Sequence, residues 1–252
     1  MVFALLAAVN LTAGFSTVGA SAYRSEAQIV GEFMGSPIRL LFPIAVAIIA
    51  GPALASELNH RYIASTRPRE DIRSSLTRKL GRISVVLFLV FSGLAAINVL
   101  AGFYVAPAIW PKSIDPAGFE LADPTAITAA VEAMAPLTRL LTVGPLAYLI
   151  GCAVWMGAQA VLFGFVTFIA VLLIRRSVLA LAIPLGVYLV ESIMFQVLSL
   201  PGLAFMSSTV YPDGLERFSI SQAIAPAIVL GAGSIIAAAC LVLTARTNPR
   251  FA

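Results

Sequence analysis

The sequence predicts an all-α integral membrane protein with six transmembrane helices and both termini in the cytoplasm. Hydrophobic residues make up 60% of the 252-residue chain and charged residues only 11%, with a mean hydropathy of +0.98. A soluble domain carries about 25% charged residues, so lipid must solvate most of this chain. Lys and Arg gather at the ends of apolar runs, as the positive-inside rule requires.

Six apolar runs approach the length of about 20 residues that a span needs. The second run contains Arg39, Pro43 and Pro52, and the fifth contains Glu191. The fourth run is too long for one upright span, so residues 136–145 are expected to lead along the interface into a tilted helix. The expected spans, in a single transmembrane domain over residues 1–252, are residues 2–20, 38–55, 83–106, 146–174, 177–198 and 223–245.

The loop after the second span fixes the orientation. Residues 57–82 carry seven of the 16 Lys and Arg residues. With this loop inside, eleven Lys/Arg residues face the cytoplasm and five face outward, which fits two cytoplasmic termini. An outer loop over residues 107–139 and an outer re-entrant hairpin over residues 199–222 follow from this topology.

The first run has a second interpretation as a cleaved signal peptide. Ala20-Ser21-Ala22 resembles a signal-peptidase site that follows an apolar stretch. The segment has no positively charged region before its apolar part, however, and this favours a membrane span.

Catalytic and cofactor motifs are missing from the sequence. It contains no P-loop, HExxH, GxSxG or GxGxxG. His60 is the single histidine and has no ligand partner nearby, while Cys152 and Cys240 lie inside apolar runs as small hydrophobes. No catalytic, cofactor-binding or metal-ligating residue is therefore assigned. An intramembrane enzyme is disfavoured because the spans lack paired acids, and nucleic acid is excluded because no mixed aromatic and basic surface occurs.

Glu191 is the only carboxylate deep in a predicted span. A charge there costs ~2.5–3.5 kcal/mol on insertion scales, so such residues face a cavity or a partner. It lies fifteen residues after Arg176, about 22 Å along a helix, and Gln196 follows about one turn later. Two interpretations stay open: Glu191 and Gln196 line a substrate path, or Glu191 is a hydrogen-bonded carboxylate near the outer headgroups.

The basic loop contains a predicted helix of its own. Arg67-Pro68 breaks the helix that continues the second span, because proline disfavours helix for the residue before it. Residues 70–79 begin with acids and end with bases, which suits the helix dipole and predicts a short amphipathic helix. The loop is either a basic collar on anionic lipid or a lever that docks into a soluble motor. Seven basic residues exceed what topology needs, which favours the lever.

The pattern Ala55-Ser56-Glu57, Arg67-Pro68-Arg69 and Arg78-Lys79-Leu80, together with the order of spans and loops, resembles the ABC type-2 (ABC-2) exporter permeases over nearly the whole chain. The resemblance implies the ABC-2 permease fold, with a coupling helix in residues 57–82 and a second cytoplasmic contact at Arg175-Arg176. Family members carry an amphipathic interfacial helix before the first span, whereas this sequence starts in the span itself; the helix is either absent or lies upstream. The ATPase-coupling residues that the resemblance implies are Glu57, Arg61, Arg67, Pro68, Arg69, Arg73, Arg175 and Arg176.

The function that the resemblance implies is that of a transmembrane permease subunit of an ATP-binding cassette exporter in the inner (plasma) membrane. The chain itself is then no enzyme, since separate ATPase subunits bind ATP and Mg²⁺. Its partners are those subunits, a second permease copy or homologous permease, and membrane lipid. The apolar spans favour a lipid, peptide or drug as substrate. The alternative is a motor-free membrane channel, scaffold or sensor subunit.

Overall fold

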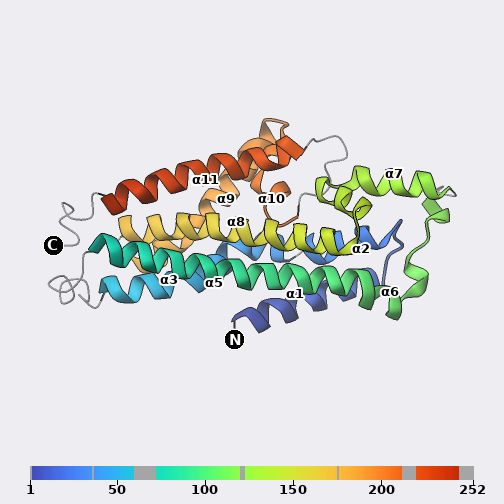
Figure 1. Cartoon of the computed structure of the whole chain (residues 1–252), viewed down its shortest axis with the longest axis horizontal. Helices are drawn as coiled ribbons and strands as arrows, with labels where there is room; N and C mark the ends of the chain where they lie inside the picture. The colour runs from blue at the N-terminus through green and yellow to red at the C-terminus, as the bar shows by residue number, and fades with distance from the viewer. Residues whose placement is uncertain are drawn as a thin grey trace.

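A computed structural model describes residues 2–35, 37–59, 72–119, 123–174, 176–211 and 220–243. These residues form long helices that run side by side (Figure 1), with an isolated bridge between Tyr23 and Ile114 and no β-strand in the described ranges. The predicted all-α class is confirmed. The apolar sequence produces helices because only a helix satisfies its backbone hydrogen bonds within one lipid-exposed segment.

Among the residues that the structure describes, four helices are long and apolar enough to cross a membrane. They are α5 (Ile72–Leu100) with its continuation to Ile109, α8 (Pro145–Leu173), α9 (Ser177–Val197) and α11 (Ile220–Leu243). They correspond to the predicted spans at residues 83–106, 146–174, 177–198 and 223–245. Several such helices in one chain indicate a multi-pass membrane protein.

Six spans are not confirmed. Helix α1 (Val2–Val18) has only 17 residues and starts near mid-length of the bundle (Figure 1). The predicted second span at residues 38–55 lies within α3 (Ile38–Asn59). A further helix, α2 (Glu26–Gly35), precedes it, and the two helices are bent by 49° at a break. Pro37 lies at this break, where the ring cannot continue the hydrogen bonding of the preceding helix. If the bent pair crosses as one unit, the described residues hold up to five spans.

The predicted short helix over residues 70–79 is wrong for the part that the structure describes. Residues from Ile72 onward are the first turns of α5, which runs through Ile83 without a break. Leu76 is buried near the end of the bundle toward which Lys79 lies. We call this end the inner end and the opposite one the outer end, because the predicted topology faces them to the cytoplasm and to the outside. Burial of Leu76 among other helices favours one continuous helix over a separate helix lying on lipid.

The outer end of α5 continues through short helical elements. The π-helical turn η1 (Ala101–Val105) and α6 (Ala106–Ile109) extend it, followed by η2 (Pro111–Ser113), η3 (Ala117–Phe119), α7 (Pro124–Met134) and η4 (Pro136–Thr142). Asp123 caps α7, since its side chain accepts from the Thr125 amide at 3.1 Å. Gly144 (φ 144°) then turns the chain into α8 through a backbone conformation that favours glycine. The expected lead-in at residues 136–145 is thus mostly a 3₁₀ helix.

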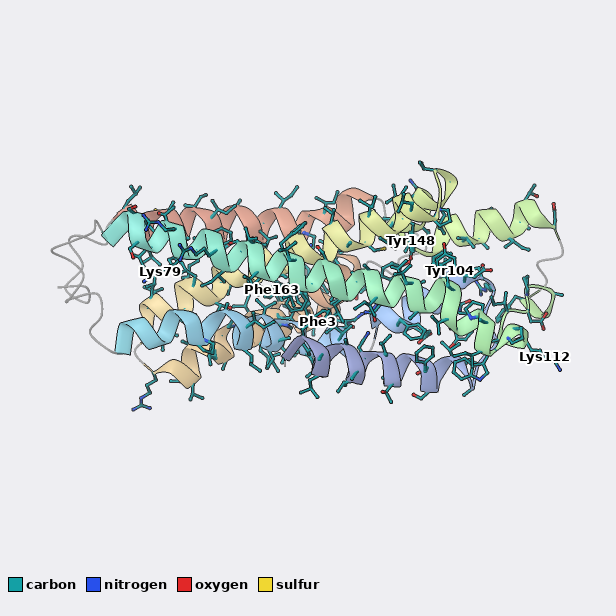
Figure 2. All side chains as sticks on the ribbon, turned by 60° about the horizontal axis from the view of Figure 1, so that its bottom comes forward. Phe3, Lys79, Tyr104, Lys112, Tyr148 and Phe163 are labelled. Carbon is teal, nitrogen blue, oxygen red and sulfur yellow. The ribbon has the colours of Figure 1, made fainter. Side chains whose placement is uncertain are left out.

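Aromatic rings form the centre of the bundle. Phe42 of α3 packs edge-on against Phe91 of α5 and Phe163 of α8, with ring centroids 5.0 and 5.8 Å apart. Helices α5 and α8 approach closely because Gly157 offers no side chain; a Cβ there would stand 2.9 Å from Phe88. Figure 2 shows Phe163 near the middle of the bundle, with Lys79 toward one end and Lys112 at the other.

Candidate functional site

An apolar groove lies between α8, α9 and α11, with a volume of about 610 Å³. On α9 its lining residues Ile183, Val187 and Glu191 recur every four positions, which places them on one helix face. We call this space the three-helix groove. Its other lining residues are Val166, Ile169, Ala170, Leu173, Ile174, Phe205, Val229, Leu230, Gly233, Ser234 and Ala237.

Glu191 joins α9 to the segment that follows it. Its Oε2 accepts a hydrogen bond from the Phe205 amide at 2.8 Å, and the Ser192 hydroxyl donates to the same oxygen at 3.5 Å. The Ser192 hydroxyl oxygen accepts from the Met206 amide at 3.1 Å. Two adjacent side chains of α9 therefore satisfy the first two amides of α10 (Phe205–Ser208), which have no partner within that helix.

The segment after α9 returns into the bundle. Ser199 adopts a left-handed conformation (φ 57°), and η5 (Pro201–Leu203) and α10 follow. Phe205 is buried against Phe163, with ring centroids 5.8 Å apart. Because Phe163 lies eighteen residues beyond Pro145, this contact is about 27 Å from the outer start of α8. The described half of the predicted hairpin at residues 199–222 therefore reaches deep between the helices; residues 212–219 lie outside the described ranges.

Two further contacts hold the hairpin against α8. The Trp155 Nε1–H donates to the carbonyl oxygen of Ser208 at 2.9 Å. The hydroxyls of Tyr148 and Tyr211, both buried, lie 2.7 Å apart and share a hydrogen bond. The hairpin is thus attached by a small set of polar contacts in an otherwise apolar core.

The two residues of the predicted substrate path do not come together. Glu191 is half-buried and lines the three-helix groove. Gln196 is exposed near the end of α9 and does not line the groove. The hydrogen-bonded carboxylate of the second interpretation is present, and its partner is the backbone of α10 within the bundle.

At the inner end, a cluster that we call the inner cluster joins four helices. Leu76 of α5 is 6% exposed and belongs to a buried cluster that also contains residues of α8, α9 and α11. The buried members of the cluster are Leu76, Phe168, Ala170, Val171, Leu172, Ala180 and Ala238. The inner ends of these four helices are therefore packed into one cluster.

The predicted coupling residues fall at or beyond this inner end. Arg176 is exposed at the start of α9, where its carbonyl oxygen accepts from the Ala180 amide at 3.0 Å. Glu57 lies in the last turns of α3, and Arg73 lies in the first turn of α5. Arg61, Arg67, Pro68, Arg69 and Arg175 are outside the described residues.

A buried asparagine pair escaped the sequence analysis. The Asn10 Nδ2 donates to the Asn98 Oδ1 at 2.9 Å and to the Phe33 carbonyl oxygen at 2.6 Å. Both side chains are at most 1% exposed, and they tie α1 to α2 and α5. An asparagine inside an apolar run is the signal that could have found them, since its amide needs a partner in lipid.

Within the described ranges, no group of three or more His, Cys, Asp or Glu residues could hold a metal ion. No model of a known protein family matches the chain, and searches of curated proteins and of solved structures find no similar protein. The three-helix groove, the hairpin and the inner cluster are therefore the features on which a function is proposed.

Proposed function

We propose that the chain is the transmembrane permease subunit of an ATP-binding cassette exporter that moves a hydrophobic or amphipathic substrate. The observation that carries this proposal is the continuity of the helix that starts at the basic loop. Residues 74–109 form one apolar helical run of 36 residues, about 54 Å long. A bilayer core is about 30 Å thick, so such a helix extends well beyond it. A push on the basic loop would thus be carried across the membrane.

The inner cluster connects the helix of residues 74–109 to the neighbouring helices. Leu76 is buried in a cluster that includes side chains of three other helices, so a shift of the start of α5 would be passed to them through this packing. Packed interfaces of this kind change by discrete rigid-body steps, because close-packed side chains do not deform continuously. ATP hydrolysis in a separate subunit would drive such a step through residues 57–82 and through Arg176.

The hairpin and the three-helix groove support export as the direction of transport. The described part of the hairpin reaches deep between the helices and is held there by a few hydrogen bonds that involve Glu191, Ser192, Trp155 and Tyr148. Exchange of those bonds would release it and open the bundle outward. The apolar lining of the groove suits a lipid, an amphipathic peptide or a drug.

The proposed assembly needs further chains. Separate ATP-binding cassette subunits would bind ATP and Mg²⁺, and a second permease copy or a homologous permease would complete the membrane part in the inner (plasma) membrane. The ABC-2 fold also requires six spans, in which α1 and the bent pair of α2 and α3 each cross once.

Charge reversal in the basic loop tests the proposal. Arg61→Glu, Arg67→Glu and Arg73→Glu are introduced together, and ATP hydrolysis and substrate export are measured with the complex in vesicles. We expect hydrolysis to lose its dependence on substrate and export to stop, because the lever no longer docks. The matched control is Lys112→Glu with Arg139→Glu, which changes charge at the outer end and is expected to keep both activities.

Protease protection of a tag after residue 252 checks that the variant keeps its orientation, since loop charges also set topology. A correctly oriented triple variant with normal coupled hydrolysis would contradict the proposal. It would favour a motor-free channel, scaffold or sensor subunit, for which the basic loop serves only lipid contact.

A further inference from the structure

We infer that the three-helix groove binds a single-chain amphiphile with a cationic amine head, which pairs with Glu191 while its apolar body lies along α8, α9 and α11. The inference rests on the proposed function in naming the class of cargo, but the binding itself requires no ATPase. It follows from the shape of the groove, from the contacts of one carboxylate and from the charge of that carboxylate.

The groove has an apolar body and one acidic end. From Ile183 to Glu191 its α9 wall spans eight residues, about 12 Å, and the other wall residues on this helix face are apolar. Leu173 of α8 and Ile174, which follows that helix, lie toward the opposite, inner end of that wall. A ligand that fits this arrangement carries its polar head at Glu191 and its chain toward the inner end.

The Glu191 carboxylate keeps capacity for a further donor. A carboxylate can accept about four hydrogen bonds, whereas the structure gives Glu191 two donors, both on Oε2. In the part of the chain that the structure describes, no basic side chain pairs with it. Its Oε1 is therefore the atom that would receive an ammonium group.

Charge selects the head group. A ligand with a neutral head group would remove water from the Glu191 carboxylate without balancing its negative charge. Desolvation of an unbalanced charge is costly. An anionic head would be repelled at this position. A phospholipid is disfavoured because its phosphate would lie beside the carboxylate, and because Glu191 lies six residues, about 9 Å, before the end of α9. A simple amine dissolved in the bilayer fits the site, because its head is neither neutral nor anionic and carries no phosphate.

Equilibrium binding to the full chain in nanodiscs tests the inference with labelled dodecylamine, dodecanol and dodecanoate. Wild type should bind dodecylamine at least tenfold more tightly than either other probe, as a charge-assisted hydrogen bond allows. Glu191→Gln should bring dodecylamine to the affinity of dodecanol, because the amide oxygen still accepts from Phe205 but carries no charge. Parity of the three probes on wild type, or an unchanged amine preference in Glu191→Gln, would overturn the inference.

Two glycine variants separate binding in the groove from partition into lipid. Gly233 lines the groove and a Cβ there would meet no atom within 4 Å, so Gly233→Phe should occupy groove space and weaken dodecylamine binding at least tenfold. Gly186 on α9 has equal space but lies outside the lining, so Gly186→Phe should bind as wild type does. Full binding by Gly233→Phe would refute the site. The binding assay contains no ATPase and does not depend on the proposed function. If the amine binds here but the complex in vesicles shows no hydrolysis coupled to transport, the result would count against the proposed function alone.

Discussion

Gly102 lies in η1, the π-helical continuation of α5, where it touches α2, and a single methyl group there tests the packing of the bundle. A Cβ at residue 102 would stand 2.7 Å from Cγ2, 2.9 Å from Cα and 3.0 Å from the amide nitrogen of Val30. Backbone atoms cannot rotate away, so α2 must shift as a whole. Overpacking of this kind costs about 1–3 kcal/mol of unfolding free energy in Gly102→Ala.

Gly93, nine residues earlier on α5, supplies the control. A Cβ there meets only Cζ of Phe3 at 3.9 Å, an ordinary van der Waals contact. Gly93→Ala should therefore stabilise the protein by about 0.5–1 kcal/mol, since alanine loses less backbone entropy in a helix. The two alanine variants should differ by about 1.5–4 kcal/mol with opposite signs.

Unfolding in mixed micelles, followed by far-UV circular dichroism, measures both variants against wild type. The reasoning is refuted if Gly102→Ala is as stable as Gly93→Ala, because α2 would then not rest on the backbone of residue 102. Crosslinking between cysteines placed on α2 and α6 checks whether the shift is local to this contact.

Three further predictions concern buried and capping polar groups. Asn98→Ala removes the acceptor of Asn10 and should lower the unfolding free energy by about 1–3 kcal/mol in the same assay. Tyr148→Phe and Tyr211→Phe should be less than additive in a double-mutant cycle, because each single change already removes the hydrogen bond that the two hydroxyls share. The hydrogen bonds to Asp123 hold its pKa below the usual value, so its capping of α7 is complete above the ordinary carboxyl pKa and lost as the pH falls through the lowered one. Hydrogen exchange of the capped amides should show this acid step in wild type and lack it in Asp123→Ala.

The long apolar helices were predictable because hydropathy is a local property. The run from Leu146 to Ile174 needs no partner to be recognised as a helix in lipid, and α8 begins and ends within one residue of that prediction. The same holds for α9, whose bounds follow from Arg176 on one side and the turn at Ser199 on the other.

The features that depend on distant partners were not predictable. Residues 72–79 look amphipathic in isolation, but Leu76 is buried in a cluster with residues of other helices, and the helix continues without a break to Leu100. Asn10 finds its partner 88 residues away at Asn98. Glu191 could be identified as an unusual charge, yet its partner is a backbone amide that a left-handed turn at Ser199 brings back to it.

Purification of the chain from its native membrane tests the central claim most directly. The account predicts that a polypeptide with a P-loop co-purifies, hydrolyses ATP, and crosslinks to residues 57–82 of this chain when a photo-reactive group is placed there. A membrane preparation of correctly folded chain that yields no such polypeptide and no ATP hydrolysis, under conditions that preserve other membrane complexes, would contradict the account.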